Sequence, residues 1–319
     1  VILITTKKGE LGKPTINFSA KVGVSSTTND IYPYGMGPGA DPMEYFNMHR
    51  DLKYQESHGT LPYYYYWRPQ DIPAGAGVSL DDWLNYADNP NSDPQEEWFN
   101  RIAIWPTEKE NYLAGRTTNF YDLIMGTGLR QDYSLGISGA TENLRYYWSV
   151  GYLDNEGIIK GDEFQAIRTR LNLDLDITDW LSVGTNTQFS NRDEGVVDAS
   201  FSDFREMSPW GSMWNEDGSL RRYPNDYTLA VNPLEDYYGQ DRLRDISSLI
   251  SALYSEIELP FGITYRLTFR PELWFRKDFN FWSSETTTGR DYNGGRGERD
   301  NDFQYNWLMD NLIKWNQTF

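Results

Sequence analysis

The sequence contains no cysteine, and only two histidines, His49 and His58, occur among its 319 residues. Without cysteine the chain has no disulfide framework, no cysteine-based zinc site and no thiol catalysis. The nine-residue spacing of the histidines neither places both on one helix face nor matches a metal motif. Paired carboxylates carry little information in a chain with 47 acidic residues. We therefore expect no enzyme activity, no metal site and no cofactor.

Long hydrophobic runs and an excess of basic charge are also missing. No stretch reaches the roughly 18 consecutive apolar residues of a membrane-spanning helix, which excludes a helical membrane protein. The net charge of −18 argues against a nucleic-acid partner, because phosphate binding requires clustered lysine and arginine. A membrane β-barrel remains compatible with this composition, since its strands are only half apolar and about 9–11 residues long.

Aromatic residues are abundant instead, with 23 Tyr, 15 Phe and 12 Trp. In residues 143–157, NLRYYWSVGYLDNEG, every second residue from Leu144 to Tyr152 is apolar or aromatic, and small or polar residues stand between them. This is the period of a β-strand with two unlike faces. The alternation recurs about eight times, at residues 16–24, 133–137, 144–152, 171–177, 181–189, 248–259, 263–269 and 303–315.

The residues between the aromatic ones indicate what each face contacts. They are mostly Ser, Gly, Asn, Asp, Gln and Thr, whereas the outer face of a soluble sandwich is expected to carry mostly Lys and Glu. Small polar side chains suit the wall of a barrel lumen. Tyr and Trp fall near strand ends, as at Tyr133 and Trp180, where the interfacial aromatic girdles of a membrane barrel lie. We expect the aromatic face to contact lipid.

Short and long connections alternate between the predicted strands. The short ones are GATEN, ITDW and LPFG, and the long ones cover about residues 25–128, 154–165, 191–245 and 277–301. Short turns at one end and long loops at the other are typical of an outer-membrane barrel. A soluble sandwich with Greek-key crossings has no reason to keep this parity. The sequence thus predicts an all-β, antiparallel transmembrane barrel, with a large soluble all-β domain as the alternative.

Two stretches resemble a known family. Residues 1–24, VILITTKKGELGKPTINFSAKVGV, resemble the plug–barrel junction of the SusC/RagA-type TonB-dependent outer-membrane transporters, and residues 119–190 resemble their early barrel strands. The resemblance implies that residues 1–13 are the end of a plug domain and its linker. It implies that residues 14–319 form the first eight or so strands of a 22-stranded plugged barrel, with the four long connections on the extracellular side.

The resemblance also implies a function. Such a protein imports an oligosaccharide or a peptide across the bacterial outer membrane, together with a SusD-like surface lipoprotein and the inner-membrane TonB complex. The TonB complex would be contacted by a plug segment outside this sequence, the barrel would contact outer-membrane lipid, and transporter–lipoprotein pairs could form a homodimer.

Two alternatives stay open. A self-contained eight-stranded barrel acting as an adhesin or structural protein requires the strand at Thr15 to pair with the strand at Trp315. A secreted all-β protein that binds or degrades carbohydrate would need no membrane.

The candidates for substrate or lipoprotein contact are aromatic residues of the long connections. LPYYYYWRP at residues 61–69 is the densest aromatic cluster, and MSPWGSMWNEDG at residues 207–218 carries two tryptophans. Flat aromatic rings stack on sugar rings, although the same residues also serve to pack a long loop. The predicted contact residues are Tyr63, Tyr64, Tyr65, Tyr66, Trp67, Trp210 and Trp214.

Other features of the long connections give weaker hypotheses. Residues 41–54 predict a helix with Asp41 as its cap and Pro42 at its first position. Tyr45, Met48 and Leu52 form its apolar face, which packs the loop or docks a partner. Arg205, Arg221 and Arg222 could bind anionic groups, but neighbouring acids favour a solvated surface. Residues 291–302 carry oxygen ligands for calcium without the EF-hand spacing.

Overall fold

The structure is a computed structural model that describes residues 9–27, 33–37, 39–87 and 90–316. The predicted end of the plug therefore lies mostly outside the described residues. Two compact units can be distinguished. The sheet unit comprises the described residues within 1–27, 126–198 and 236–319, and the helical unit those within 28–125 and 199–235.

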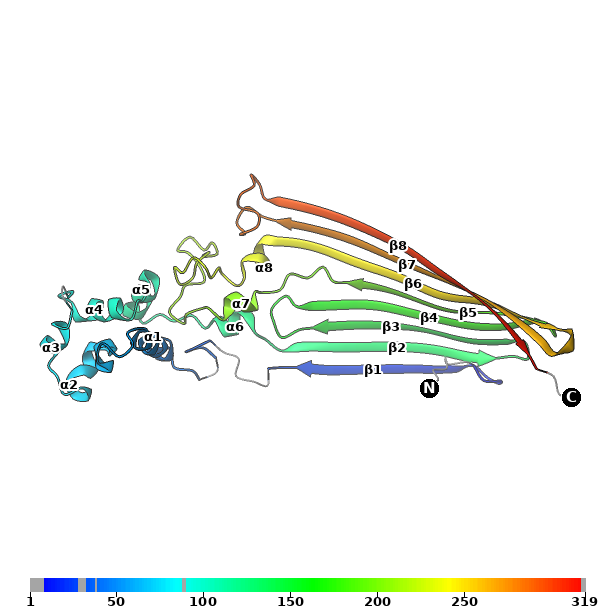
Figure 1. Ribbon diagram of the computed structural model, residues 1–319, viewed down its shortest axis with the longest axis horizontal. Coiled ribbons are helices and arrows are strands. Elements are labelled where there is room, and N and C mark those ends of the chain that lie inside the picture. The colour runs from blue at the N-terminus through cyan, green and yellow to red at the C-terminus, as the bar shows by residue number, and fades with distance from the viewer. Residues whose placement is uncertain (1–8, 28–32, 38, 88–89, 317–319) are drawn as a thin grey trace. The chain divides into compact units, whose positions relative to one another are not determined.

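The sheet unit is one antiparallel sheet of eight strands that follow each other in chain order (Figure 1). The strands are β1 (Thr15–Ser25), β2 (Gly128–Ala140), β3 (Leu144–Glu156), β4 (Glu163–Thr178), β5 (Leu181–Asp193), β6 (Gln240–Leu259), β7 (Ile263–Trp282) and β8 (Arg296–Trp315). Each strand pairs with its neighbours in sequence, and in the described residues β1 and β8 are the two edges. The predicted all-β antiparallel fold is confirmed, and the sheet is open rather than closed on itself.

The strand register keeps like residues on the same face. Val150 on β3 lies opposite Leu135 on β2, whereas the adjacent Ser149 lies opposite Gly136 and Arg170. Because successive side chains point to opposite faces, this register gives the sheet one apolar, aromatic face and one polar face. On the edge strands the apolar side chains are strongly exposed, with Phe18 70% and Trp307 61% accessible. A contiguous apolar surface of this kind needs a covering layer.

The connections alternate in length as the sequence predicted. Residues 141–143, residues 179–180 and the 3₁₀ turn η3 (Pro260–Gly262) are the short ones. The long ones follow β1, β3, β5 and β7. In an antiparallel sheet in chain order, every second connection lies at the same end of the strands, so the short turns share one end and the long connections the other.

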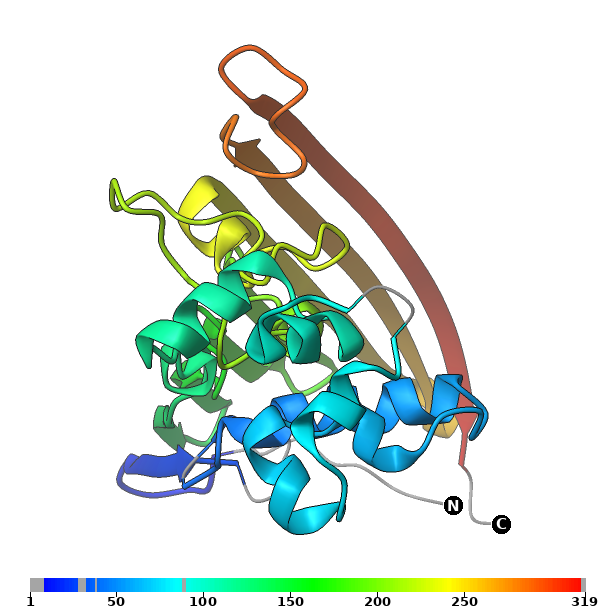
Figure 2. The same cartoon turned by 90° about the vertical axis from the view of Figure 1, so that its left-hand side faces the viewer.

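The helical unit consists of short helices from the first and third long connections (Figure 2). They are α1 (Met43–Glu56), η1 (Tyr63–Tyr66), η2 (Pro69–Asp71), α2 (Ile72–Gly75), α3 (Leu80–Leu84), α4 (Pro94–Arg101), α5 (Pro106–Ala114), α6 (Phe120–Ile124) and α7 (Phe201–Phe204), and α8 (Glu235–Gly239) precedes β6. The predicted helix is α1; it begins one residue later than expected, and the Asp41 carboxylate accepts a hydrogen bond from the Met43 N–H at 2.9 Å.

Aromatic side chains form the core of the helical unit. Phe46 of α1 is buried and packs edge-on against Trp98 of α4, with ring centroids 5.6 Å apart. Its other face stacks on Trp210, at 5.2 Å and 8° between planes. Residues more than a hundred positions apart in sequence thus meet in one core. In the described part of the chain, no helix is both long and apolar enough to cross a membrane.

Candidate functional site

The predicted aromatic cluster at residues 61–69 contains η1. The indole N–H groups of two buried tryptophans donate hydrogen bonds to its backbone. Trp83 Nε1 donates to the carbonyl oxygens of Tyr64 and Tyr65, both at 3.1 Å. Trp98 Nε1 donates to the Tyr66 carbonyl at 3.2 Å. These bonds satisfy buried polar groups and hold the segment against α3 and α4.

Arg101 at the end of α4 fixes the same segment, and sequence reasoning did not single it out. Its guanidinium carbon lies 4.0 Å from the centre of the Tyr65 ring and 3.9 Å from that of Trp83. Its Nε donates to Glu97 Oε1 at 2.7 Å, and both side chains are buried. A cation between two aromatic faces, paired with a carboxylate, is a strong packing element. The i, i+4 spacing of Glu97 and Arg101 is the only signal of it in the sequence.

The predicted contact residues divide by their exposure. Tyr66 and Trp210 are buried, and Trp210 Nε1 donates to the Pro42 carbonyl at 3.1 Å. Tyr64, Tyr65 and Trp67 are half-buried, whereas Tyr63 and Trp214 are exposed. The cluster therefore packs the helical unit and also presents part of its surface. A role of these residues in substrate or lipoprotein contact stays a prediction.

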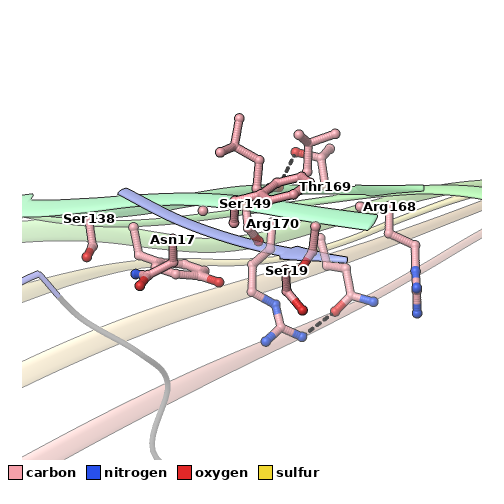
Figure 3. Close-up of a pocket in the computed structure, with 15 residues that line it drawn as sticks. Asn17, Ser19, Ser138, Ser149, Arg168, Thr169 and Arg170 are labelled. Atoms are coloured by element: carbon pink, nitrogen blue, oxygen red, sulfur yellow. Dashed lines mark hydrogen bonds between the residues drawn. The ribbon is translucent and has the colours of Figure 1, made fainter. Parts of the chain in front are cut away.

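A hollow of about 500 Å³ lies on the polar face of the sheet unit (Figure 3). Figure 3 shows Arg168 and Arg170 of β4 pointing to the same side as Asn17 and Ser19 of β1, whereas Thr169 points to the other. Arg170 Nη2 donates to Gln188 Oε1 at 2.7 Å. No carboxylate is among the lining residues, which are Asn17, Phe18, Ser19, Ser134, Leu135, Gly136, Ser138, Tyr147, Ser149, Val150, Gly151, Arg168, Thr169, Arg170 and Gln188. The polar face thus offers guanidinium, hydroxyl and amide groups, as the wall of a lumen would.

A second cavity, of about 310 Å³, lies within the helical unit beside α1. Of its lining residues, sequence reasoning singled out Tyr45, Met48 and Leu52 as a helix face and Arg205 as a weak anion contact. It missed Trp105 and Tyr227, because each is an isolated aromatic residue in an irregular stretch of the sequence. The full lining is Pro33, Tyr34, Tyr45, Met48, His49, Leu52, Trp105, Arg205, Glu206, Met207, Asn225 and Tyr227.

Behind this cavity lies the buried carboxyl of Glu108, at the start of α5. Its Oε2 accepts a hydrogen bond from the Trp105 N–H at 3.0 Å. Burial raises the pKa of Glu108 to about 7, although hydrogen bonds from Trp105, Ser208 and Tyr45 act in the opposite direction. Among the described residues, no group of three or more His, Asp or Glu side chains is arranged to hold a metal ion.

Comparison with known proteins shows what the chain is similar to. No protein-family model matches it. TonB-dependent receptor P39 of Formosa agariphila is 29% identical over 204 residues, which are 62% of this chain and 19% of that receptor. TonB-dependent receptor SusC of Bacteroides thetaiotaomicron is 30% identical over 147 residues, 41% of this chain and 15% of SusC. The matched regions thus span less than a fifth of either curated relative.

The solved structures agree in fold. The RagAB peptide importer in its closed-closed state superposes with a TM-score of 0.62, covering 98% of this chain and 34% of the importer chain. At 16% identity this likeness shows the fold alone. Sequence and fold together confirm the resemblance to the barrel of TonB-dependent transporters. Within that class, the likeness is to the SusC/RagA type.

Proposed function

We propose that this chain forms the early barrel of an outer-membrane, TonB-dependent importer of oligosaccharide. Residues 14–319 contribute the first eight strands of a 22-stranded barrel, the size at which the lumen holds a plug. Residues 1–13 contribute the end of that plug. The four long connections lie on the extracellular side.

The observation that carries this proposal is the open, two-faced sheet with short turns at one end and long connections at the other. The aromatic face suits lipid, and several polar groups on that face are hydrogen-bonded, as a lipid environment requires. The Thr169 hydroxyl donates to the Ser149 carbonyl at 2.9 Å and accepts from Trp148 Nε1 at 3.0 Å. Thr187 and Ser251 are joined through their hydroxyls at 2.7 Å. A self-contained eight-stranded barrel would instead need β1 to pair with β8.

The partners follow from the family. A SusD-like lipoprotein covers the extracellular side, and the inner-membrane TonB complex supplies energy from the proton motive force. The cargo is an oligosaccharide, which the exposed aromatic side chains of the helical unit suit. A peptide is the alternative cargo, because the RagAB structure that resembles this fold is named a peptide importer.

The test is uptake by intact cells of a strain that lacks the gene and by the complemented strain. We expect the gene to be required for growth on at least one purified polysaccharide. A protonophore should abolish uptake of the labelled oligosaccharide while surface binding persists. Uptake that continues with the protonophore, or growth defects on peptides alone, would contradict the proposal.

A further inference from the structure

The cavity beside α1 has one wall made by a single helix face. Tyr45, Met48, His49 and Leu52 stand at positions i, i+3, i+4 and i+7, so their side chains share one side of α1. Tyr45 is buried and forms part of the floor, and Leu52 is 46% exposed at the rim. All lining residues belong to the helical unit, so the cavity is a property of that unit by itself.

Trp105 and Tyr227 form an aromatic pair in the lining of the same cavity, called the aromatic platform below. The rings of Trp105 and Tyr227 have their centroids 6.3 Å apart and are tilted by 33°, so the two rings pack against each other. Trp105 remains 42% exposed and Tyr227 36%, and Tyr34 adds a third exposed ring. Grouped exposed aromatic rings at a cavity are typical of binding sites rather than of solvated surface.

Two neighbouring polar residues, the half-buried Asp226 and the buried Asn225, hold this platform in place. Asp226 has a left-handed backbone, with φ of 61°, and its carboxylate accepts from the Thr107 N–H at 2.8 Å and from Arg221 Nη2 at 2.7 Å. Partial burial raises the pKa of Asp226, but these hydrogen bonds outweigh it and lower the pKa below its ordinary value. Tyr227 is thereby fixed beside Trp105 at the start of α5.

The neighbouring Asn225 ties the remaining wall to the same segment. It is 3% exposed; its Oδ1 accepts from the Ser208 N–H at 3.2 Å and its Nδ2 donates to the Glu206 carbonyl at 2.8 Å. The segment that carries Arg205 and Glu206 is therefore anchored to the segment that carries Tyr227. The walls are organised before any ligand arrives, which lowers the entropic cost of binding.

The rim supplies both donors and acceptors of hydrogen bonds. The side chains of Arg205 and Glu206 are exposed and line the cavity. His49 Nδ1 lies 3.3 Å from the Ile102 carbonyl, so Nδ1 carries the proton and Nε2 is left as an acceptor. Burial lowers the pKa of His49 and keeps this ring neutral at pH 7.

We propose that this cavity binds one sugar ring of a glycan cargo. This rests on the proposed function and deepens it, because it names a subsite for the cargo. A pyranose has an apolar C–H face for Trp105 and Tyr227 and a rim of hydroxyls, each both donor and acceptor, for Arg205, Glu206 and His49. A peptide bound by strand addition would need a free strand edge, and only helices and irregular segments line the cavity in the described residues.

The experiment measures binding to the full-length transporter, purified in detergent, by isothermal titration calorimetry. The probes are hexasaccharides of glucose, xylose, mannose, galactose and galacturonic acid, and a tryptic digest of casein serves as the peptide probe. The variants are Trp105→Ala and Tyr227→Ala, with Tyr86→Ala as the matched control. Tyr86 is an exposed aromatic residue of the same unit that does not line the cavity.

We expect one hexasaccharide to bind, and each cavity variant to weaken its binding about tenfold, because the sugar loses an aromatic ring to stack on. Trp105→Phe should restore most of the affinity, which a general folding defect would not allow. Binding that is unchanged in both alanine variants, binding of peptides alone, or no binding of any probe would overturn the proposal. Failure of the import function is separate: it would appear as uptake by wild-type cells that ignores the protonophore.

Discussion

Single residues decide how the long connections hold together, and Arg101 is the clearest case. Its guanidinium satisfies Glu97, lies between the rings of Tyr65 and Trp83, and donates to the Trp83 carbonyl at 3.1 Å. A buried ion pair is weak evidence for net stability, because desolvating both charges is costly. Removing one partner is different, since the other charge then stays buried without compensation.

Replacing Arg101 by alanine should therefore destabilise the helical unit by about 3–5 kcal/mol. The measurement is limited proteolysis of the detergent-purified protein, with cleavage between residues 60 and 110 as the readout. Lys53→Ala is the matched control, because Lys53 forms an exposed pair with Glu56 that is worth about 0.5 kcal/mol. Equal protease resistance of the Arg101 and Lys53 variants would contradict this account.

Glu108 gives the helical unit a pH dependence of its own. Because its pKa is raised to about 7 in the folded state, the folded protein keeps a proton that the unfolded chain loses above its ordinary value near 4.5. Stability is therefore lost as pH rises from about 4.5 to 7, by up to about 3 kcal/mol, and stays low above that range.

Glu108→Gln should remove this part of the pH dependence, so that the fall in unfolding temperature from about pH 4.5 to about pH 8 is smaller in the variant than in the wild type. Near-UV circular dichroism of the aromatic core is the measurement. The pKa of His49 is lowered, so the contribution of His49 to stability rises with pH. His49 is present in both proteins, so this contribution cancels in the difference between the variant and the wild type. Asp226, with its lowered pKa, titrates below this range. A variant that keeps the full wild-type slope would show that Glu108 does not cause it.

Among the elements, η1 consists of four consecutive tyrosines, some of which pack in the core while others are exposed on the surface. Tyr66 is buried and its carbonyl accepts from Trp98 Nε1, while the exposed Tyr63 donates its hydroxyl to Asp51 Oδ1 at 2.5 Å. Deleting Tyr63–Trp67 as a block would also remove the carbonyl acceptors of Trp83 and Trp98. Such a deletion cannot separate loss of contact from loss of fold.

Point substitutions in η1 separate the two roles. Tyr66→Ala should destabilise the helical unit by about 3 kcal/mol or more, as large-to-small core substitutions do. Tyr63→Ala should leave protease resistance within the range of a surface change and weaken uptake of the cargo. Uptake by Tyr63→Ala cells at the wild-type rate would remove Tyr63 from the contact residues.

At the scale of the whole molecule, the open sheet predicts a larger barrel. If the eight strands are part of a 22-stranded barrel with a plug, the native polypeptide should have roughly three times the 37.1 kDa of this chain. Intact mass spectrometry of the protein extracted from outer membranes measures this. A mass near 37.1 kDa would mean that β1 and β8 close on themselves, and the import proposal would fall.

The sheet and the α1 helix could be predicted from the sequence, whereas the packing of the helical unit could not, for one physical reason. In a two-faced strand, apolar and polar residues alternate along consecutive positions. The alternation from Leu144 to Tyr152 therefore indicates a strand without reference to the rest of the chain. The core of the helical unit joins Phe46 to Trp210, and its cavity joins His49, Trp105 and Tyr227. No local period connects such residues, and η1 lacks any apolar alternation to show that Tyr66 is buried and Tyr63 is not.

The strand order also has a consequence for how fast this sheet can form. Every pairing joins neighbours in sequence, so most pairings are local hairpins, and local pairings form quickly. The pairing of β1 with β2 spans the longest separation, residues 26–127, and the pairing of β5 with β6 spans residues 194–239. Closing a longer loop costs only about 0.6 kcal/mol more for each doubling of its length. The long connection therefore destabilises the β1–β2 pairing little at equilibrium, but this pairing forms late. We expect β1 to join the sheet after the hairpins of β2–β3, β4–β5 and β6–β7 exist, which leaves the edge of β2 unpaired and prone to aggregation during biogenesis.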